Sequence, residues 1–448
     1  MKRLVLVFAL LALVSCAGES NLPTPTGKGT IRSINAMAGS PSVAFRLEKF
    51  LVGQAGFQDV TNSLRFDDFD YIFNWEAVYL GELSARNIAS HMDKIETGMD
   101  YTFVLTGNVN APVVNVWESS EREWNGDETV IELQFANYAP EASVLGPIDV
   151  YLAPDGTVPV AGEQIATLDF GEIMPPIDVE AIEYVLTITR AGDPMDILFQ
   201  SLPTLYIAQS AVISPIFDGD EHQETAYLSV LLVNKTGATA RLVDATADPT
   251  IRFIQASIDL ATSDVYDDVT LTNLILSGHA FADITNDMPI AIGQTSHYYT
   301  PVGDTSAVLF ESGIATVQNT HWNWVVLGTA GNRFAHSYLP NRRSVSIYAR
   351  LQFFHAALNN TFVDIYVVDA DVPIDDENTT LFDFTFSVLV PPLPYASGSY
   401  DIYVTLPNEK TVIGGPLRIN VIDGDVVELM LFDTVDPAVV DIRVLPTQ

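Results

Sequence analysis

Short runs in which apolar and polar residues alternate recur along most of the chain. Residues 147–152 and 362–367 are two clear examples, and residues 101–105 are similar. Alternation with period two is typical of a strand buried on one face, because successive side chains point to opposite faces. Few stretches have the period and length of a helix, and residues 84–96 fit a helix best. The pattern therefore predicts a chain built mainly of β-strands.

The strand-like runs belong to an internal repeat. Four stretches open with a similar apolar run that contains a shared alanine, and the alanines are Ala36, Ala136, Ala256 and Ala356. The first and third copies are as far apart as the second and fourth, which indicates a two-domain unit that was itself duplicated. A second strand-like run follows each opening, at residues 42–47, 147–152, 268–271 and 362–367. An aromatic strand start comes next, at Tyr71, Tyr184, Tyr298 with Tyr299, and Tyr400.

The repeat length fixes the expected fold class. Each copy has room for about seven short strands with turn signals between them, the pattern of one antiparallel sandwich. Asp423-Gly424, between two apolar runs, is a hairpin signal. We therefore expect an all-β chain of four tandem immunoglobulin-like antiparallel β-sandwich domains. Their expected ranges are 30–125, 126–248, 249–345 and 346–448.

The amino terminus has the pattern of a lipoprotein signal peptide, residues 1–15. A basic start precedes an apolar run, 4–14, that is too short to span a bilayer. The run ends beside Cys16, the only cysteine, in a stretch that resembles a bacterial lipobox. That resemblance implies that Cys16 carries the lipid anchor, and Ala17 after it implies sorting to the cell outer membrane. Residues 16–29 are small, polar and rich in Pro and Gly, as expected of a tether.

The repeat motifs resemble a known family. The fourth copy carries His355-Ala356, then Val363-Asp364-Ile365-Tyr366, then Gly398-Ser399-Tyr400. These motifs are similar to those of the DUF4397 family, tandem sandwich domains of exported bacterial proteins. The second copy matches well, whereas the first and third depart from the second motif. The resemblance covers about residues 30–448 and implies a fold and an exported location. It implies no catalytic residues, because the family has no agreed activity.

Composition and charge exclude several classes of protein. Hydrophobic residues make up 48% of the 448 residues, which excludes disorder for most of the chain. Asp and Glu number 57 against 21 Lys and Arg, a net charge of −36, so nucleic acid is not expected as a partner. A single cysteine excludes a disulfide scaffold and a cysteine-based zinc site.

No motif for catalysis is present in the sequence. The seven histidines form no HExxH pair, and neither a GxSxG elbow nor a phosphate-binding glycine loop occurs. His355 stands where the first copy has Asn35 and the third has Gln255, which favours a hydrogen-bonding role at a strand end. We therefore expect no enzyme activity, no catalytic residues and no cofactor.

Two sets of residues are candidates for binding. Four acids, Asp369, Asp371, Asp375 and Asp376, form the best cluster for calcium, although Asp is also common in turns of solvated loops. Trp124 lies in a polar junction, where it is a candidate to stack on a sugar or to pack between domains. Trp322 and Trp324 lie on one strand face, which points either to a ligand platform or to core packing.

The sequence thus predicts a non-catalytic, lipid-anchored cell-envelope protein. We expect a rod of four domains that presents a surface to an envelope protein or polysaccharide. The alternative is a carbohydrate-binding protein that uses exposed tryptophans. The expected location is the outer membrane, on either its periplasmic or its outer face.

Overall fold

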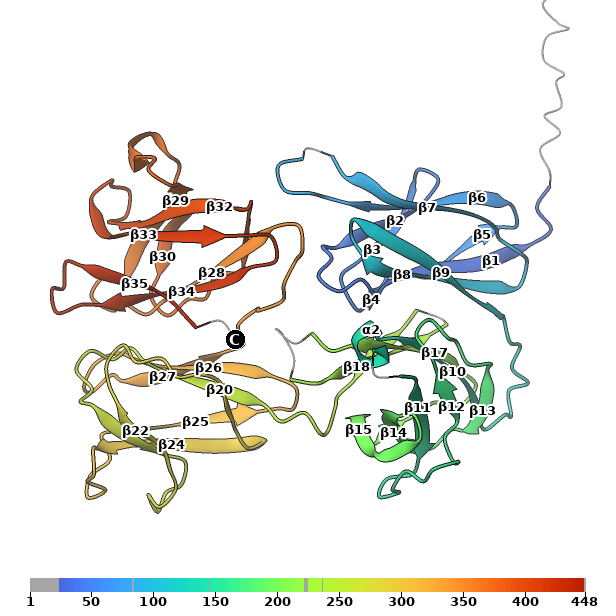
Figure 1. Cartoon of the computed structure of the whole chain (residues 1–448), viewed down its shortest axis with the longest axis horizontal. Helices are drawn as coiled ribbons and strands as arrows, with labels where there is room; N and C mark the ends of the chain where they lie inside the picture. The colour runs from blue at the N-terminus through green and yellow to red at the C-terminus, as the bar shows by residue number, and fades with distance from the viewer. Residues whose placement is uncertain (1–23, 83, 145, 221–224, 236, 447–448) are drawn as a thin grey trace, which may run out of the picture.

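The computed structural model describes residues 24–446 except 83, 145, 221–224 and 236 (Figure 1). Strands make up 54% of the described residues and helices 2%, which confirms the all-β fold class. No helix among the described residues is long and apolar enough to cross a membrane. The expected signal peptide, Cys16 and most of the tether lie outside the described residues.

The first segment, residues 28–120, forms two sheets (blue to teal in Figure 1). We call the sheet that contains β1, the first strand of the segment, the opening sheet. It has the order β4-β1-β8-β9, and β5 also pairs with β1. The companion sheet has the order β3-β2-β6-β7. The strands are β1 (Lys28–Asn35), β2 (Val43–Leu47), β3 (Phe50–Ala55), β4 (Asp59–Val60), β5 (Leu64–Asp67), β6 (Asp70–Ala77), β7 (Arg86–Lys94), β8 (Met99–Asn108) and β9 (Ala111–Ser120).

The second segment, residues 130–242, repeats this plan. Its opening sheet has the order β13-β10-β17-β18-β19, and its companion sheet β12-β11-β14-β15, with β16 also on β14. The elements are β10 (Val130–Tyr138), α2 (Pro140–Ser143), β11 (Ile148–Ala153), β12 (Ala166–Leu168), β13 (Ile177–Glu180), β14 (Glu183–Arg190), β15 (Asp193–Gln200), β16 (Thr204–Leu205), β17 (Ala211–Asp218), β18 (Leu228–Asn234) and β19 (Thr239–Leu242).

The third segment, residues 250–338, has the opening sheet β23-β20-β26-β27 and the companion sheet β22-β21-β24-β25. Its strands are β20 (Thr250–Gln255), β21 (Ser263–Tyr266), β22 (Leu274–His279), β23 (Met288–Pro289), β24 (Gly293–Pro301), β25 (Phe310–Thr316), β26 (His321–Leu327) and β27 (Phe334–Tyr338).

The fourth segment, residues 349–444, has the opening sheet β31-β28-β34-β35 and the companion sheet β30-β29-β32-β33. Its elements are β28 (Ala349–His355), β29 (Phe362–Asp369), the 3₁₀ turn η1 (Ile374–Asp376), β30 (Leu381–Thr385), β31 (Leu393–Tyr395), β32 (Gly398–Thr405), β33 (Val412–Val421), β34 (Val426–Asp433) and β35 (Val440–Val444).

Each opening strand pairs in parallel with a later strand of its sheet. The pairs are β1·β8, β10·β17, β20·β26 and β28·β34. The expectation of wholly antiparallel sheets is therefore wrong at this ladder, whereas the other ladders between the described strands are antiparallel. The central opening strands are buried on both faces, and their polar residues, such as Arg32 and Arg252, are buried with the apolar ones.

A polar side chain ends each opening strand in the same way. In all four segments it accepts a hydrogen bond of 2.9–3.2 Å from the backbone N–H two residues on. The four residues are Asn35, Asn137, Gln255 and His355. This confirms the hydrogen-bonding role predicted for His355, whose pKa burial lowers to about 4. It also corrects the alignment of the second copy, because Tyr138, and not Ala136, takes the place of Ala36, Ala256 and Ala356.

A buried aspartate on the second strand holds a turn in three segments. Asp149, Asp264 and Asp364 accept hydrogen bonds of 2.8–2.9 Å from the backbone N–H groups of residues 192, 303 and 408, which all have left-handed backbone. The second motif of the third copy is therefore Ser263–Tyr266, and the placement at residues 268–271 was wrong.

Replacement of Asp264 by asparagine is expected to remove part of the acid sensitivity of the third segment. The Gly303 N–H, with further help from Gly278 and Ser277, outweighs burial and lowers the pKa of Asp264. The carboxylate therefore stabilises the fold above its ordinary pKa, and this contribution is lost as the pH falls. Calorimetry from pH 3 to 7 should show a loss of about 1–3 kcal/mol near pH 7, which shrinks in acid. Asp248→Asn, at an exposed position, is the matched control. It should change neither the stability at pH 7 nor its dependence on pH.

The segments pack in pairs through the outer faces of their opening sheets. One apolar cluster joins the first and second segments: Ile34, Ala36, Val104, Trp117, Ala136, Tyr138, Ile213, Phe217, Leu231 and Val233. A second joins the third and fourth: Ile254, Ala256, Ala282, Val325, Leu327, Tyr338, Phe354, Ala356, Met430, Phe432 and Leu445. The expectation of an extended rod is therefore wrong, since apolar opening-sheet faces bury each other rather than face water.

The two pairs also contact each other. The Ser346 N–H donates to the Gly39 carbonyl at 2.7 Å, and the Arg343 guanidinium donates to the Ser40 carbonyl. Ala226 N–H donates to the Asn319 side chain at 2.8 Å. The four segments consequently form the two-by-two block seen in Figure 1.

Two local predictions were wrong. Residues 84–96 do not form a helix, because β7 (Arg86–Lys94) pairs along its length with β6. Asp423-Gly424 does not close a hairpin either, because β33 pairs with β32, whereas β34 pairs with β28 and β35. The turn carries the chain from one sheet to the other.

Candidate functional site

A groove of about 510 Å³ lies between the first and second segments. Strands β1, β5 and β8 contribute one side, and β17 and β18 with the connection before β10 contribute the other. The lining residues are Thr30, Ser63, Arg65, Asp100, Glu121, Arg122, Trp124, Gln209, Ser210, Ala211, Asn234 and Lys235. The groove thus contains one of the three tryptophans proposed from the sequence.

Trp124 is half-buried, and its ring is fixed by Arg122. The guanidinium carbon lies 4.0 Å from the centre of the ring, a cation–π arrangement. Arg122 is held in turn by Glu128 at 2.9 Å and by a hydrogen bond to Asp178, which raises the pKa of the arginine. A ring oriented in this way is a preformed flat surface at the groove wall.

Charges in the groove are balanced pairwise. The Lys235 ammonium lies 2.9 Å from a Glu132 carboxylate oxygen and 3.9 Å from Asp100. Burial raises the pKa of Asp100, opposed by the charges of Lys235 and Arg32. On the other side, Arg65 pairs with Glu121 at 3.1 Å. The groove is therefore polar without a strong net field of either sign.

Arg32 joins the two segments behind the groove. Its Nε donates to Thr102 Oγ1 at 2.8 Å and its Nη1 to the Asn234 carbonyl at 3.1 Å. Burial lowers the pKa of Arg32 to about 10. This buried arginine fixes the relative position of the two walls.

The other tryptophans proposed for binding are packed inside. Trp324 is 1% exposed and belongs to the core of the third segment, against which Trp322 is partly buried. The Trp322 Nε1 donates to Thr320 at 2.9 Å. Asn323 points to the opposite face, where it donates to Glu428 at 2.6 Å. These two residues therefore present no exposed aromatic pair.

The acids proposed for calcium are not gathered around one point. In the described residues, no group of three or more His, Cys, Asp or Glu side chains could hold a metal ion. Asp371 accepts a hydrogen bond from Arg418 at 2.6 Å, and Arg418 also lowers the pKa of Asp401 to about 2. Asp369, Asp375 and Asp376 are exposed, the last two in η1. Cys16, proposed for lipidation, lies outside the described residues.

A buried ionic network lies between the third and fourth segments. Asp287 lies 3.2 Å from Arg252 Nε and 3.5 Å from His321 Nδ1 and also pairs with Arg342. Glu428, from the fourth segment, accepts hydrogen bonds from Asn323 and, at 2.7 Å, from Tyr338. Burial raises the pKa of Glu428, whereas Arg342 and Arg252 outweigh the effect of burial on Asp287 and lower its pKa. The network joins two segments, and its members are directed at one another.

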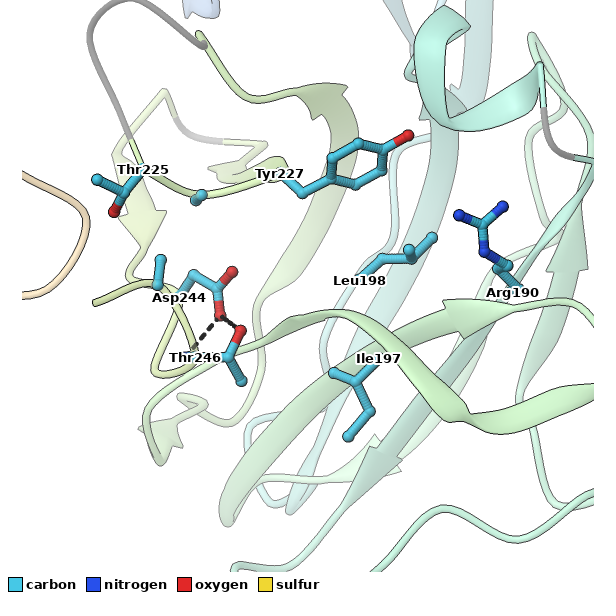
Figure 2. Close-up of a pocket in the computed structure, with 9 residues that line it drawn as sticks. Arg190, Ile197, Leu198, Thr225, Tyr227, Asp244 and Thr246 are labelled. Atoms are coloured by element: carbon cyan, nitrogen blue, oxygen red, sulfur yellow. Dashed lines mark hydrogen bonds between the residues drawn. The ribbon is translucent and has the colours of Figure 1, made fainter. Parts of the chain in front are cut away.

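A shallower hollow of about 290 Å³ lies on the second segment (Figure 2). Asp244 on its wall accepts hydrogen bonds from Gln200 N–H and from both the backbone and hydroxyl of Thr246. That carboxylate therefore holds the loop together, and the hollow offers less ligand chemistry than the groove.

Sequence reasoning identified Trp124 but missed its partners. Arg65 and Lys235 come from distant parts of the chain, and nothing near them in the sequence marks them as neighbours of Trp124, whereas Arg122 is only two residues away. The one usable signal was a tryptophan in a polar junction, a position where a side chain serves either packing or a ligand.

Comparison with known proteins assigns no family. No family model matches the chain, and no curated protein matches it. Among the solved structures that match is the Bacillus anthracis TIE protein, which is 7% identical, with 88% of this chain and 69% of that chain covered at a TM-score of 0.15. The resemblance to DUF4397 remains a prediction.

Proposed function

We propose that this chain is a non-catalytic, lipid-anchored protein of the bacterial cell envelope that binds a neutral saccharide. Its four segments serve as tandem immunoglobulin-like domains of the DUF4397 type, and the lipid on Cys16 holds them at the outer membrane. The observation that carries the binding proposal is the groove around Trp124, where a fixed aromatic ring lies among hydroxyl, amide and charged groups.

The chemistry of the groove favours this ligand class. Sugar rings present C–H faces that stack on aromatic rings, and hydroxyl groups that bond to serine, threonine and amide side chains. The groove offers both, through Trp124 and through Thr30, Ser63 and Gln209. A net charge of −36 repels polyanions, and the pairing of charges inside the groove favours a neutral ligand.

Substitution of Trp124 by alanine is expected to weaken saccharide binding at least tenfold, about 1.4 kcal/mol. The probes are maltohexaose, cellohexaose and chitohexaose, titrated calorimetrically into the full chain. Phe382→Ala is the matched control, because Phe382 is an aromatic residue that is 60% exposed and outside the groove. No binding of any probe, or equal loss in both variants, would contradict the saccharide proposal.

A further inference from the structure

A cavity of about 220 Å³ opens between the two sheets of the third segment. Ile251 and Phe253 line it from the opening sheet, and Thr295 and His297 line it from β24 of the companion sheet. The rest of the wall is mostly apolar: Ile275, Met288, Pro289, Ile290 and Ala291, with the exposed Asp267. An apolar cavity with a few polar groups is the usual composition of a site for a small organic molecule.

Strand register shows that Thr295 replaces a tyrosine. In each segment the central residue of the second strand pairs with one residue of the next long strand of the companion sheet, which is β6, β14, β24 or β32. The pairs are Phe45 with Trp75, Val150 with Ile188, Val265 with Tyr299, and Ile365 with Val404. Four residues earlier on that strand stand Tyr71, Tyr184, Thr295 and Tyr400. The three tyrosines pack against the cores of their segments. The third segment therefore lacks one phenol ring, and the cavity lies at that place.

The neighbouring position on the same strand is also exceptional. Two residues before the paired centre, the other segments have Phe73, Leu186 and Ile402, all fully buried. The third segment has His297, which is 1% exposed. Within the described residues, neither ring nitrogen of His297 has a hydrogen-bond partner, and the Thr295 hydroxyl has none. Unpartnered buried polar atoms reduce stability, and a ligand that bonds to them restores the loss.

The histidine ring is held rigidly. Phe253 and Trp324 contact it edge to face, with ring centres 4.9 and 5.2 Å away. Burial lowers the pKa of His297 to about 4, so the ring is neutral at pH 7. A neutral imidazole presents one donor and one acceptor. The cavity thus combines a ring-sized apolar space with a donor, an acceptor and a hydroxyl.

We propose that this cavity binds a neutral molecule made of one aromatic ring with a hydroxyl group, a substituted phenol in chemical class. The ligand ring takes the place of the missing tyrosine ring, and its hydroxyl bonds to His297. An apolar cavity of about 150 Å³ admits benzene, so the volume present leaves room for small substituents. The Asp267 carboxylate at the wall disfavours anionic ligands.

The test is calorimetric titration of the full chain with p-cresol, with toluene and benzoate as comparison probes. The wild type should bind p-cresol at least tenfold more tightly than toluene and should not bind benzoate. Thr295→Tyr, which restores the residue of the other segments, should bind neither p-cresol nor toluene. His297→Leu, which copies Leu186, should keep the cavity but bind p-cresol and toluene equally.

Tyr400→Thr is the matched control, because it opens the corresponding place in the fourth segment above the apolar Ile402. In a chain that also carries Thr295→Tyr, it should admit p-cresol and toluene without preference. Failure of the wild type to bind p-cresol, or unchanged binding in Thr295→Tyr, overturns the proposal. Equal affinity of the wild type for p-cresol and toluene overturns the role of His297. The saccharide groove around Trp124 is unaffected by either result.

Discussion

Replacement of Phe354 by aspartate is expected to separate the third and fourth segments. Phe354 is fully buried between them, stacked on Tyr338 with ring centres 4.8 Å apart. The variant removes a large apolar side chain, which alone costs about 3–5 kcal/mol, and it leaves a carboxylate without a partner. Small-angle scattering should show a larger radius of gyration, while circular dichroism retains the β signal because the cores inside each segment are untouched.

The matched control for this substitution is Phe362→Asp, at a position that is 51% exposed. It should leave the radius of gyration and the melting profile unchanged. An unaltered radius for Phe354→Asp would contradict the view that the apolar faces of the opening sheets hold the pair together.

Removal of the Glu428 carboxylate is the second large expected effect. Arg252 is buried, with 1% of its surface exposed. In Glu428→Ala it retains the ion pair with Asp287 but loses the ion pair with Glu428 across the interface. Removal of one member of a buried ionic group costs about 3–5 kcal/mol, because the remaining charge is left uncompensated. Calorimetry should show this loss as a lower melting temperature of the third and fourth segments.

Glu428→Gln distinguishes charge from hydrogen bonding. The amide oxygen keeps the bonds from Tyr338 and Asn323, so the loss should be well below that of Glu428→Ala. Because burial raises the pKa of Glu428, the folded wild type binds a proton more tightly than the unfolded chain does. Its stability should therefore decrease as the pH rises above the ordinary carboxyl pKa, and Glu428→Gln should lack that decrease. Identical pH profiles would contradict this assignment.

The strands were predictable because their alternation reflects burial on one face. The second runs at residues 147–152 and 362–367 correspond to β11 and β29. Residues 84–96 misled because short apolar spacing also fits a helix, and only pairing with the preceding strand β6 decides for a strand. Likewise, Asp423-Gly424 specifies a tight turn but not which sheets its flanking strands join.

The alignment of the second repeat was wrong because it followed residue identity, whereas the hydrogen bond at the end of the opening strand defines the equivalent positions. Ala136 resembles the shared alanines in sequence, yet Asn137 makes the bond that marks the strand end. For the binding groove, Trp124 was visible in the sequence, whereas the contact between Lys235 and Asp100 depends on the docking of two segments. No local pattern encodes such docking, because it is set by which apolar faces meet.

The bulk of Tyr138 has a consequence for partner choice. It stands where the other three segments have Ala36, Ala256 and Ala356, so one interface combines a large residue with a small one and the other combines two methyl groups. Two copies of the second segment would bring two rings to the same spot, which close packing does not tolerate. Shape thus discriminates against packing of the second segment on another copy of itself, so that its apolar face accepts a partner with a small residue at this position, as the first segment has in Ala36.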